Sequence, residues 1–172
     1  MRVKTIFAGL LLMSMTATAQ LKSPDEFLGY PLGSKFTPHY KIVNYFNQTV
    51  AAMPQLMKLE KYGETNEGRE LLLAFVSSAE NMTRLEEIRR NNLRLTGMLK
   101  DKPADLSAPA IVWLSFNVHG NEASSSEVSM KTLYELLNPA NAQTKEWLKN
   151  TVVIIDPCLN PDGRDRYVNW FN

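Results

Sequence analysis

The residues best suited to chemistry are a histidine and a glutamate three positions apart, His119 and Glu122. They follow the apolar run 110–116 and precede a helical pattern. A strand would fix the backbone and Gly120 would permit a tight turn, so an imidazole nitrogen and a carboxylate oxygen can converge on one ion. Zinc accepts both ligand types at about 2.0–2.2 Å. The spacing predicts a zinc site; the alternative is a turn histidine followed by an acid favoured early in a helix.

A second motif, Asn160-Pro161-Asp162-Gly163, follows the next strongly apolar run, 151–155. Alone it is typical of an ordinary type I or type II turn leaving a strand. In this order, however, the two motifs resemble the zinc carboxypeptidases of the M14 family, in which a similar Asn-Pro-Asp-Gly follows the strand after the His-x-x-Glu helix. The resemblance covers residues 37–172 and implies that the second motif shapes the floor of the site.

The resemblance also implies a mechanism, hydrolysis of the last peptide bond of a peptide or protein by zinc-activated water. One zinc ion would be held by His119, Glu122 and a further histidine. In the family, that histidine, a glutamate acting as general base, and an Asn-Arg pair with a tyrosine for the substrate all lie downstream. None of them can be placed before Asn172. We therefore expect this chain to be the N-terminal part of a longer catalytic domain and to be inactive alone.

An arginine beyond the second motif stabilises the oxyanion in the family, and the resemblance implies this catalytic role for Arg166, with Arg164 as the second candidate. A guanidinium aimed at developing negative charge suits that task. Relatives with the same signature cleave amide-linked acyl groups or peptidoglycan peptides. The resemblance therefore leaves more than one type of scissile bond as an alternative. A non-catalytic exported binding module on the same scaffold is the alternative from another class.

Other reactive side chains have simpler interpretations. Cys158 is the only cysteine, which excludes an internal disulfide, and its context indicates a small buried residue at a strand end rather than a nucleophile. No Gly-x-Ser-x-Gly elbow surrounds the serines that follow Glu122. Ser124 and Glu127 instead match a capping box. The second histidine, His39, is a possible third ligand but has no supporting spacing.

The N-terminus has the pattern of an export signal. Arg2 and Lys4 precede an apolar core at 6–15 and a small-residue cleavage site at 17–19, so residues 1–19 read as a signal peptide. A signal anchor is the alternative, but the apolar stretch is short for a bilayer. We expect a secreted or periplasmic protein with no membrane span. Loss of this segment leaves 17 basic against 18 acidic residues, which argues against nucleic acid as a partner.

The remaining pattern indicates α/β architecture, a mixed, largely parallel sheet with helices on both faces and one domain over 37–172. An irregular lead, 20–36, precedes a helix with Thr37 at its N-cap and Pro38 at its first position, ending near Pro54. The charged segment 82–96 is typical of a helix or surface arm with a solvated face, in preference to an RNA-binding stripe. The expected strands are 56–63, 70–77, 110–118 and 151–155, and further helices run to Leu137 and over 144–149.

Overall fold

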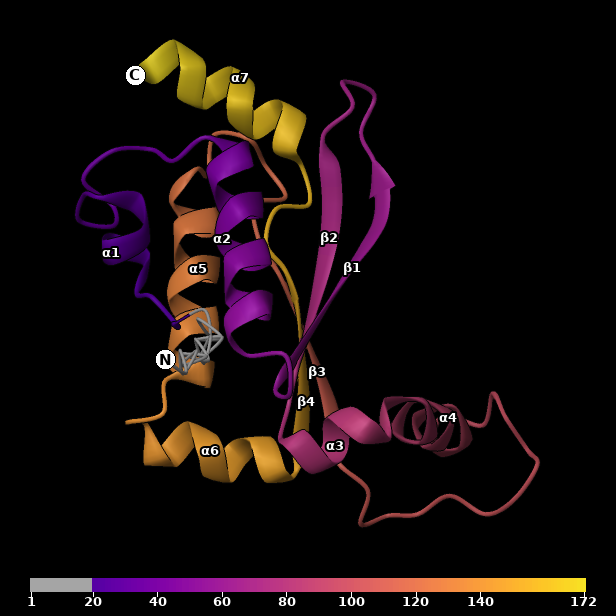
Figure 1. Cartoon of the computed structure of the whole chain (residues 1–172). Coiled ribbons are helices and arrows are strands. Elements are labelled where there is room, and N and C mark those ends of the chain that lie inside the picture. Colours follow the sequence, from indigo (N-terminus) through magenta and orange to yellow (C-terminus); the bar gives the residue numbers. More distant parts are fainter. Residues whose placement is uncertain (1–19) are drawn as a thin grey trace, which may run out of the picture.

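A mixed sheet forms the centre of the molecule. The computed structural model describes residues 20–172, so the predicted signal peptide lies outside the described residues. The strands are, in spatial order, β1 (Met57–Glu64), β2 (Glu70–Val76), β4 (Thr151–Asp156) and β3 (Ala110–Ser115) (Figure 1). β1 pairs antiparallel with β2, β2 antiparallel with β4, and β3 parallel with β4.

The predicted mixed α/β sheet is confirmed, but its parallel part is smaller than expected. Among the described strands only β3 and β4 run parallel. The connection between β1 and β2 is a short turn, and such a turn joins only antiparallel neighbours. β3 and β4, in contrast, are separated by two helices, which is the crossover that a parallel pair requires.

Helices cover the two faces of the sheet unequally. They are α1 (Pro24–Leu28), α2 (His39–Ala52), α3 (Ala79–Thr83), α4 (Leu85–Leu95), α5 (Ser124–Leu137), α6 (Ala142–Lys149) and α7 (Pro161–Phe171). α2 and α5 lie side by side on one face, with α1 outside them, and α7 crosses the end of the sheet where β4 finishes (Figure 1). The main core fills the space between these helices and the sheet. Its fully buried members include Ile42, Phe46, Met130, Leu133, Val76 and Ile155.

The opposite face carries a smaller apolar cluster. Ile88 of α4 packs there against Val152 and Ile154 of β4. On the edge strand β3, Trp113 remains 57% exposed. Helices therefore lie on both faces, as expected, but α4 covers only part of the second one.

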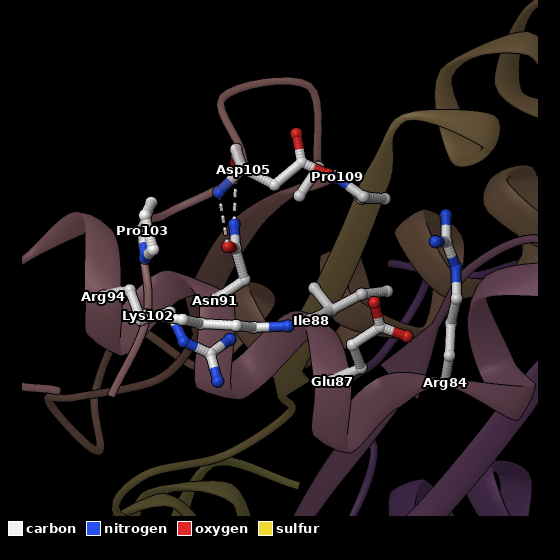
Figure 2. A pocket seen from close by; sticks show the side chains of 10 residues that line it. Arg84, Glu87, Ile88, Asn91, Arg94, Lys102, Pro103, Asp105 and Pro109 are labelled. Carbon is white, nitrogen blue, oxygen red and sulfur yellow. Dashed lines mark hydrogen bonds between the residues drawn. The ribbon is translucent and has the colours of Figure 1, made fainter. Parts of the chain in front are cut away.

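The connector that follows α4 is attached to that helix by polar contacts. The Asn91 side chain donates to the Asp105 carbonyl oxygen and accepts from the Asp105 amide, both at 2.8 Å, beside a small pocket (Figure 2). Arg94 and Arg90 both bind Asp101. Arg89 pairs with Glu86 one turn away. Arg89 and Arg90 agree with the predicted solvated, ion-paired face, whereas the Arg94 side chain is only 6% exposed. Most of the segment 82–96 forms α4, and its first two residues end α3.

Two expectations about the N-terminal part were wrong. The lead 20–36 is not wholly irregular, because α1 forms there with a complete capping box between Ser23 and Glu26. α2 begins at His39 with Pro38 as N-cap, so Thr37 does not cap it. The Thr37 amide donates instead to Glu127 at 2.6 Å, and the His39 amide at the start of α2 donates to Asp165 of α7. No helix within residues 20–172 combines the length and apolar character needed to cross a membrane.

Candidate metal centre

The two sequence motifs meet because they leave neighbouring parallel strands at the same edge of the sheet. β3 and β4 are in register up to Ser115 opposite Asp156. Backbone hydrogen bonds continue beyond the strands, from Leu159 to the Phe116 carbonyl at 2.9 Å and from Asn160 to the Asn117 carbonyl at 3.1 Å. The carboxyl edge of an α/β sheet is the usual place for a ligand site.

His119 and Glu122 lie on the turn between β3 and α5. The Glu122 amide donates to the His119 carbonyl at 3.1 Å, which closes the turn. His119 Nδ1 lies 3.3 Å from Glu122 Oε1, and the two side chains are 71% and 60% exposed. Two atoms each about 2.1 Å from a tetrahedral zinc ion are about 3.4 Å apart. The pair therefore fits one zinc ion in both chemistry and spacing.

Gly120 joins the two motifs by direct backbone packing. A Cβ atom on Gly120 would lie 2.1 Å from the carbonyl carbon of Gly163, so only glycine fits between the turn and α7. Asn160 adds a polar link, since its side chain donates to the Val118 carbonyl at 3.2 Å. The close contact accounts for Gly120, whereas a Cβ atom on Gly163 would instead meet the Asn160 side chain, at 2.7 Å from Nδ2.

Asn160-Pro161-Asp162-Gly163 is the start of a helix rather than an isolated turn. Asn160 is the N-cap of α7, Pro161 occupies its first turn, and the Asn160 side-chain oxygen accepts from the Gly163 amide at 2.9 Å. Proline is well suited to this position because its missing N–H would have no helical partner there. The motif thus sets where α7 begins and how it approaches the His119 turn.

The tip of the β1–β2 hairpin holds α7 in place from the other side. Arg69 contacts Asp162 at 2.7 Å and Asp165 at 2.8 Å. Thr65 donates to Asp162 at 2.7 Å. α7 is therefore fixed by backbone contact at Gly163 and by charged contacts along its first turns.

Arg166, the predicted catalytic arginine, lies on the open surface of α7. Its side chain is 80% exposed and makes one long contact, 3.5 Å, to Glu67. It borders a shallow hollow together with Tyr167 and Trp170, and Gly120 and Asn121 form the adjoining wall. Arg166 is thus next to the His119 turn and largely exposed.

Arg164, the second candidate, is fully buried and points into the protein. Its guanidinium contacts Glu127 and Asn117, both at 2.9 Å, and the carbonyls of Thr37 and Ala123. An arginine held in this way is out of reach of a substrate. Its contacts connect α7, the start of α5 and the segment before α2.

The predicted capping box of α5 is wrong. α5 has Ala123 as N-cap with no side-chain cap, and Glu127, with only 3% of its surface exposed, pairs with Arg164. The attraction of a buried cation outweighs a local cap on the surface. The sequence did contain a signal, since Glu127 lies three residues before Met130, on the inward side of the helix.

Asn117 was also missed by the sequence analysis. Among residues 20–172, Asn117 is the one non-glycine residue with a positive φ, 56°. Its side chain donates to the His119 carbonyl at 2.6 Å. Asparagine tolerates this conformation better than most residues. Ser125 and Ser126 bind the Asn117 amide and side-chain oxygen, both at 2.9 Å, which gives these serines a structural explanation.

The remaining candidates are placed away from the turn or are inert. His39 is buried, and its Nε2 lies 2.9 Å from the Glu70 carbonyl, so it does not approach His119. Among residues 20–172 no group of three or more metal-binding side chains is found.

Cys158 is buried, as predicted, and burial raises the pKa of its thiol to about 11. Burial also raises the pKa of the neighbouring Asp156 carboxyl, which accepts from the Tyr62 hydroxyl at 2.9 Å.

The mixed sheet, with both motifs joined at one carboxyl edge, defines part of a carboxypeptidase-type α/β domain. The profile of the family Peptidase_M14, zinc carboxypeptidase, matches residues 42–170. This match covers well over half of the chain. The chain therefore belongs to the zinc carboxypeptidase family, as the two motifs predicted.

Solved structures support the fold. Thrombin-activatable fibrinolysis inhibitor is similar with a TM-score of 0.58 and 16% identity, over 82% of this chain and 31% of that one. Carboxypeptidase A from Helicoverpa armigera has a TM-score of 0.55 and 18% identity, over 78% and 28%. A metallo-carboxypeptidase from Burkholderia cenocepacia has a TM-score of 0.53 and 17% identity, over 77% and 29%.

At these identities the likeness concerns the fold alone. The chain spans less than one third of the length of each of these three structures. No curated protein matches the chain.

Proposed function

We propose that the protein containing this chain is an exported zinc metallocarboxypeptidase whose first two metal ligands are His119 and Glu122. The observation that carries the proposal is the 3.3 Å separation of His119 Nδ1 and Glu122 Oε1 on an exposed turn. That turn lies within the part of the chain that matches the family. Export rests on the signal-like residues 1–19.

A zinc ion bound there would supply a water whose pKa is lowered towards about 7. His119 and Glu122 would provide one neutral and one anionic ligand, and a third ligand would come from outside the described residues. Arg166, beside the turn on α7, would bind negative charge that develops on the carbonyl of the scissile bond. Its high exposure leaves the side chain free to approach a substrate.

The peptide bond at the C-terminus of a peptide or protein is the proposed target. An amide-linked acyl group or a peptidoglycan peptide is the alternative within the family. Release of C-terminal amino acids from unmodified peptides supports carboxypeptidase activity, whereas cleavage of only the other two substrates supports the alternative. We propose that residues 1–172 alone are inactive; in support, residues 20–172 contain no group of three or more metal-binding side chains.

The ligand assignment is tested with His119→Ala and Glu122→Gln in the full-length protein. We expect each to weaken zinc binding by more than about 100-fold. Loss of a group that only hydrogen-bonds to a metal ligand weakens binding by up to about 100-fold, and loss of the ligand itself should have a larger effect. Zinc affinity is measured by competition with a chromophoric chelator. His39→Gln is the matched control, because it alters the other histidine of this chain, which lies away from the turn. Unchanged zinc affinity in His119→Ala would refute the assignment.

A further inference from the structure

The side chains of His119 and Glu122 contact each other but have no other polar partner in the part of the chain that the structure describes. Their directions must therefore be set by the backbone of the turn that carries them. Two carbonyls bracket this turn, that of His119 at its start and that of Ala123 just after Glu122. Both accept hydrogen bonds from buried side chains beneath the turn.

The donor at the end of the turn is Arg164. Its Nη1 donates to the Ala123 carbonyl and, at 2.9 Å, to Asn117 Oδ1. Nη2 donates to Glu127 Oε1 at 2.9 Å and to the Thr37 carbonyl at 2.6 Å. The guanidinium is 0% exposed, and Glu127 is the carboxylate that balances its charge. A planar fork held at several points has one orientation available to it.

The donor at the start of the turn is Asn117. Its Nδ2 donates to the His119 carbonyl at 2.6 Å, and its Oδ1 accepts from Arg164. The Asn117 backbone has a φ of 56°, and its amide donates to Ser125 at 2.9 Å. Asn117 therefore shapes the backbone just before the turn. Its side chain also links Arg164 by hydrogen bonds to the carbonyl of His119, the proposed metal ligand.

We propose that Arg164 and Asn117 are positioning residues for the metal ligands, acting through the backbone carbonyls on either side of the His119–Glu122 turn. The proposal rests on the proposed function, since it takes His119 and Glu122 as the ligands. Partners beyond the ligand shell orient the ligands and affect metal affinity. Glu127 contributes by neutralising the buried guanidinium, which could not remain inside the protein unpaired.

The test must separate positioning from general support of the fold. Removal of Arg164 alone would leave Glu127 as an uncompensated buried charge. The double variant Arg164→Met, Glu127→Gln removes both charges and keeps an acceptor for the Thr37 amide. A second variant, Asn117→Gly, can adopt the positive φ and removes the side-chain hydrogen bonds while Arg164 and Glu127 remain paired.

Each variant is made in the full-length protein and titrated with Co²⁺, whose visible spectrum reports the geometry of its ligands. We expect Co²⁺ affinity to fall by about 10- to 100-fold in both variants, with altered visible bands. The matched control is Arg94→Met, Asp101→Asn, which removes a different ion pair, between an arginine and an aspartate, far from the turn. It should leave the Co²⁺ affinity and spectrum unchanged even if the unfolding midpoint falls.

The possible results are distinguishable. Wild-type Co²⁺ affinity and spectrum in a folded Arg164→Met, Glu127→Gln protein would overturn the positioning role, and if that protein does not fold, Asn117→Gly decides by the same criterion. His119→Ala, measured alongside, tests the proposed function itself. If His119→Ala binds Co²⁺ as the wild type does, the ligand assignment fails and the positioning role fails with it.

Discussion

At the scale of single residues, His39 shows how burial sets a charge state. Desolvation lowers the pKa of its imidazole, and the Glu70 carbonyl hydrogen bond and Asp165 only partly oppose this effect. The folded protein therefore favours neutral His39, whereas the unfolded chain takes up a proton near pH 6.5. The stability that this contributes is fully present above that pH and is lost as the pH falls towards the folded-state pKa.

We expect the wild type to lose more stability than His39→Gln between pH 7.5 and pH 5, measured as the change in urea midpoint. Glutamine keeps a donor for the Glu70 carbonyl but does not titrate. Both proteins retain His119, so any contribution from that side chain cancels in the comparison. Equal losses in the two proteins would contradict the assignment of this pH dependence to His39.

At the scale of elements, the contact between Gly120 and Gly163 fixes the His119 turn against α7. Gly120→Ala would place a Cβ atom 2.1 Å from the Gly163 carbonyl carbon, and backbone atoms cannot yield as a flexible side chain can. We expect a loss of about 3 kcal/mol in the free energy of unfolding, at the upper end for overpacking. Chemical denaturation measures it.

Gly63→Ala in β1 is the matched control. Its added Cβ would meet only the Leu71 side chain, at an ordinary 3.8 Å. The change in stability should stay within about 1 kcal/mol, because alanine is no worse than glycine inside a strand. If the two substitutions have the same effect, the Gly120 contact is not the constraint that the structure indicates.

At the scale of the whole molecule, one face of the sheet is only partly covered. Trp113, Ile111, Val152 and Phe75 line a hollow beside α4, and Trp113 lies on the edge strand β3. Exposed apolar surface next to an unpaired strand edge favours association. We expect residues 20–172, prepared alone, to self-associate. Trp113→Lys should raise the dissociation constant about tenfold, which corresponds to a loss of about 1.4 kcal/mol in the free energy of association.

Sedimentation over a range of concentrations measures this effect. Trp147→Lys is the matched control, because Trp147 is similarly exposed, at 55%, but lies on α6, away from the hollow. A similar loss of association in both variants would point to a general effect of added charge.

Much of the fold could be read from local pattern. The four strands were expected within a few residues of their observed bounds. Short hydrophobic segments that are rich in strand-forming residues and lie between turn residues usually form strands. The parallel fraction of the sheet was overestimated, since strand direction depends on which strands become neighbours. The proposed ligand pair could be picked out because His119 and Glu122 are close in sequence, whereas Arg164 and Asn117 meet across 47 positions.

Two copies of one pattern mark the boundary between local and tertiary information. Ser23 and Glu26 form a capping box in the lead that was expected to be irregular. Ser124 and Glu127 have the same spacing but form no box, because a buried guanidinium from α7 binds Glu127. The sequence by itself determined the strands, the helices α2, α5 and α6, and the proximity of His119 and Glu122, all of which depend on neighbours along the chain; α1 and α7 were not expected. Only the tertiary structure decided which polar side chains are buried beneath that pair, because their partners come from distant segments whose approach no local pattern encodes.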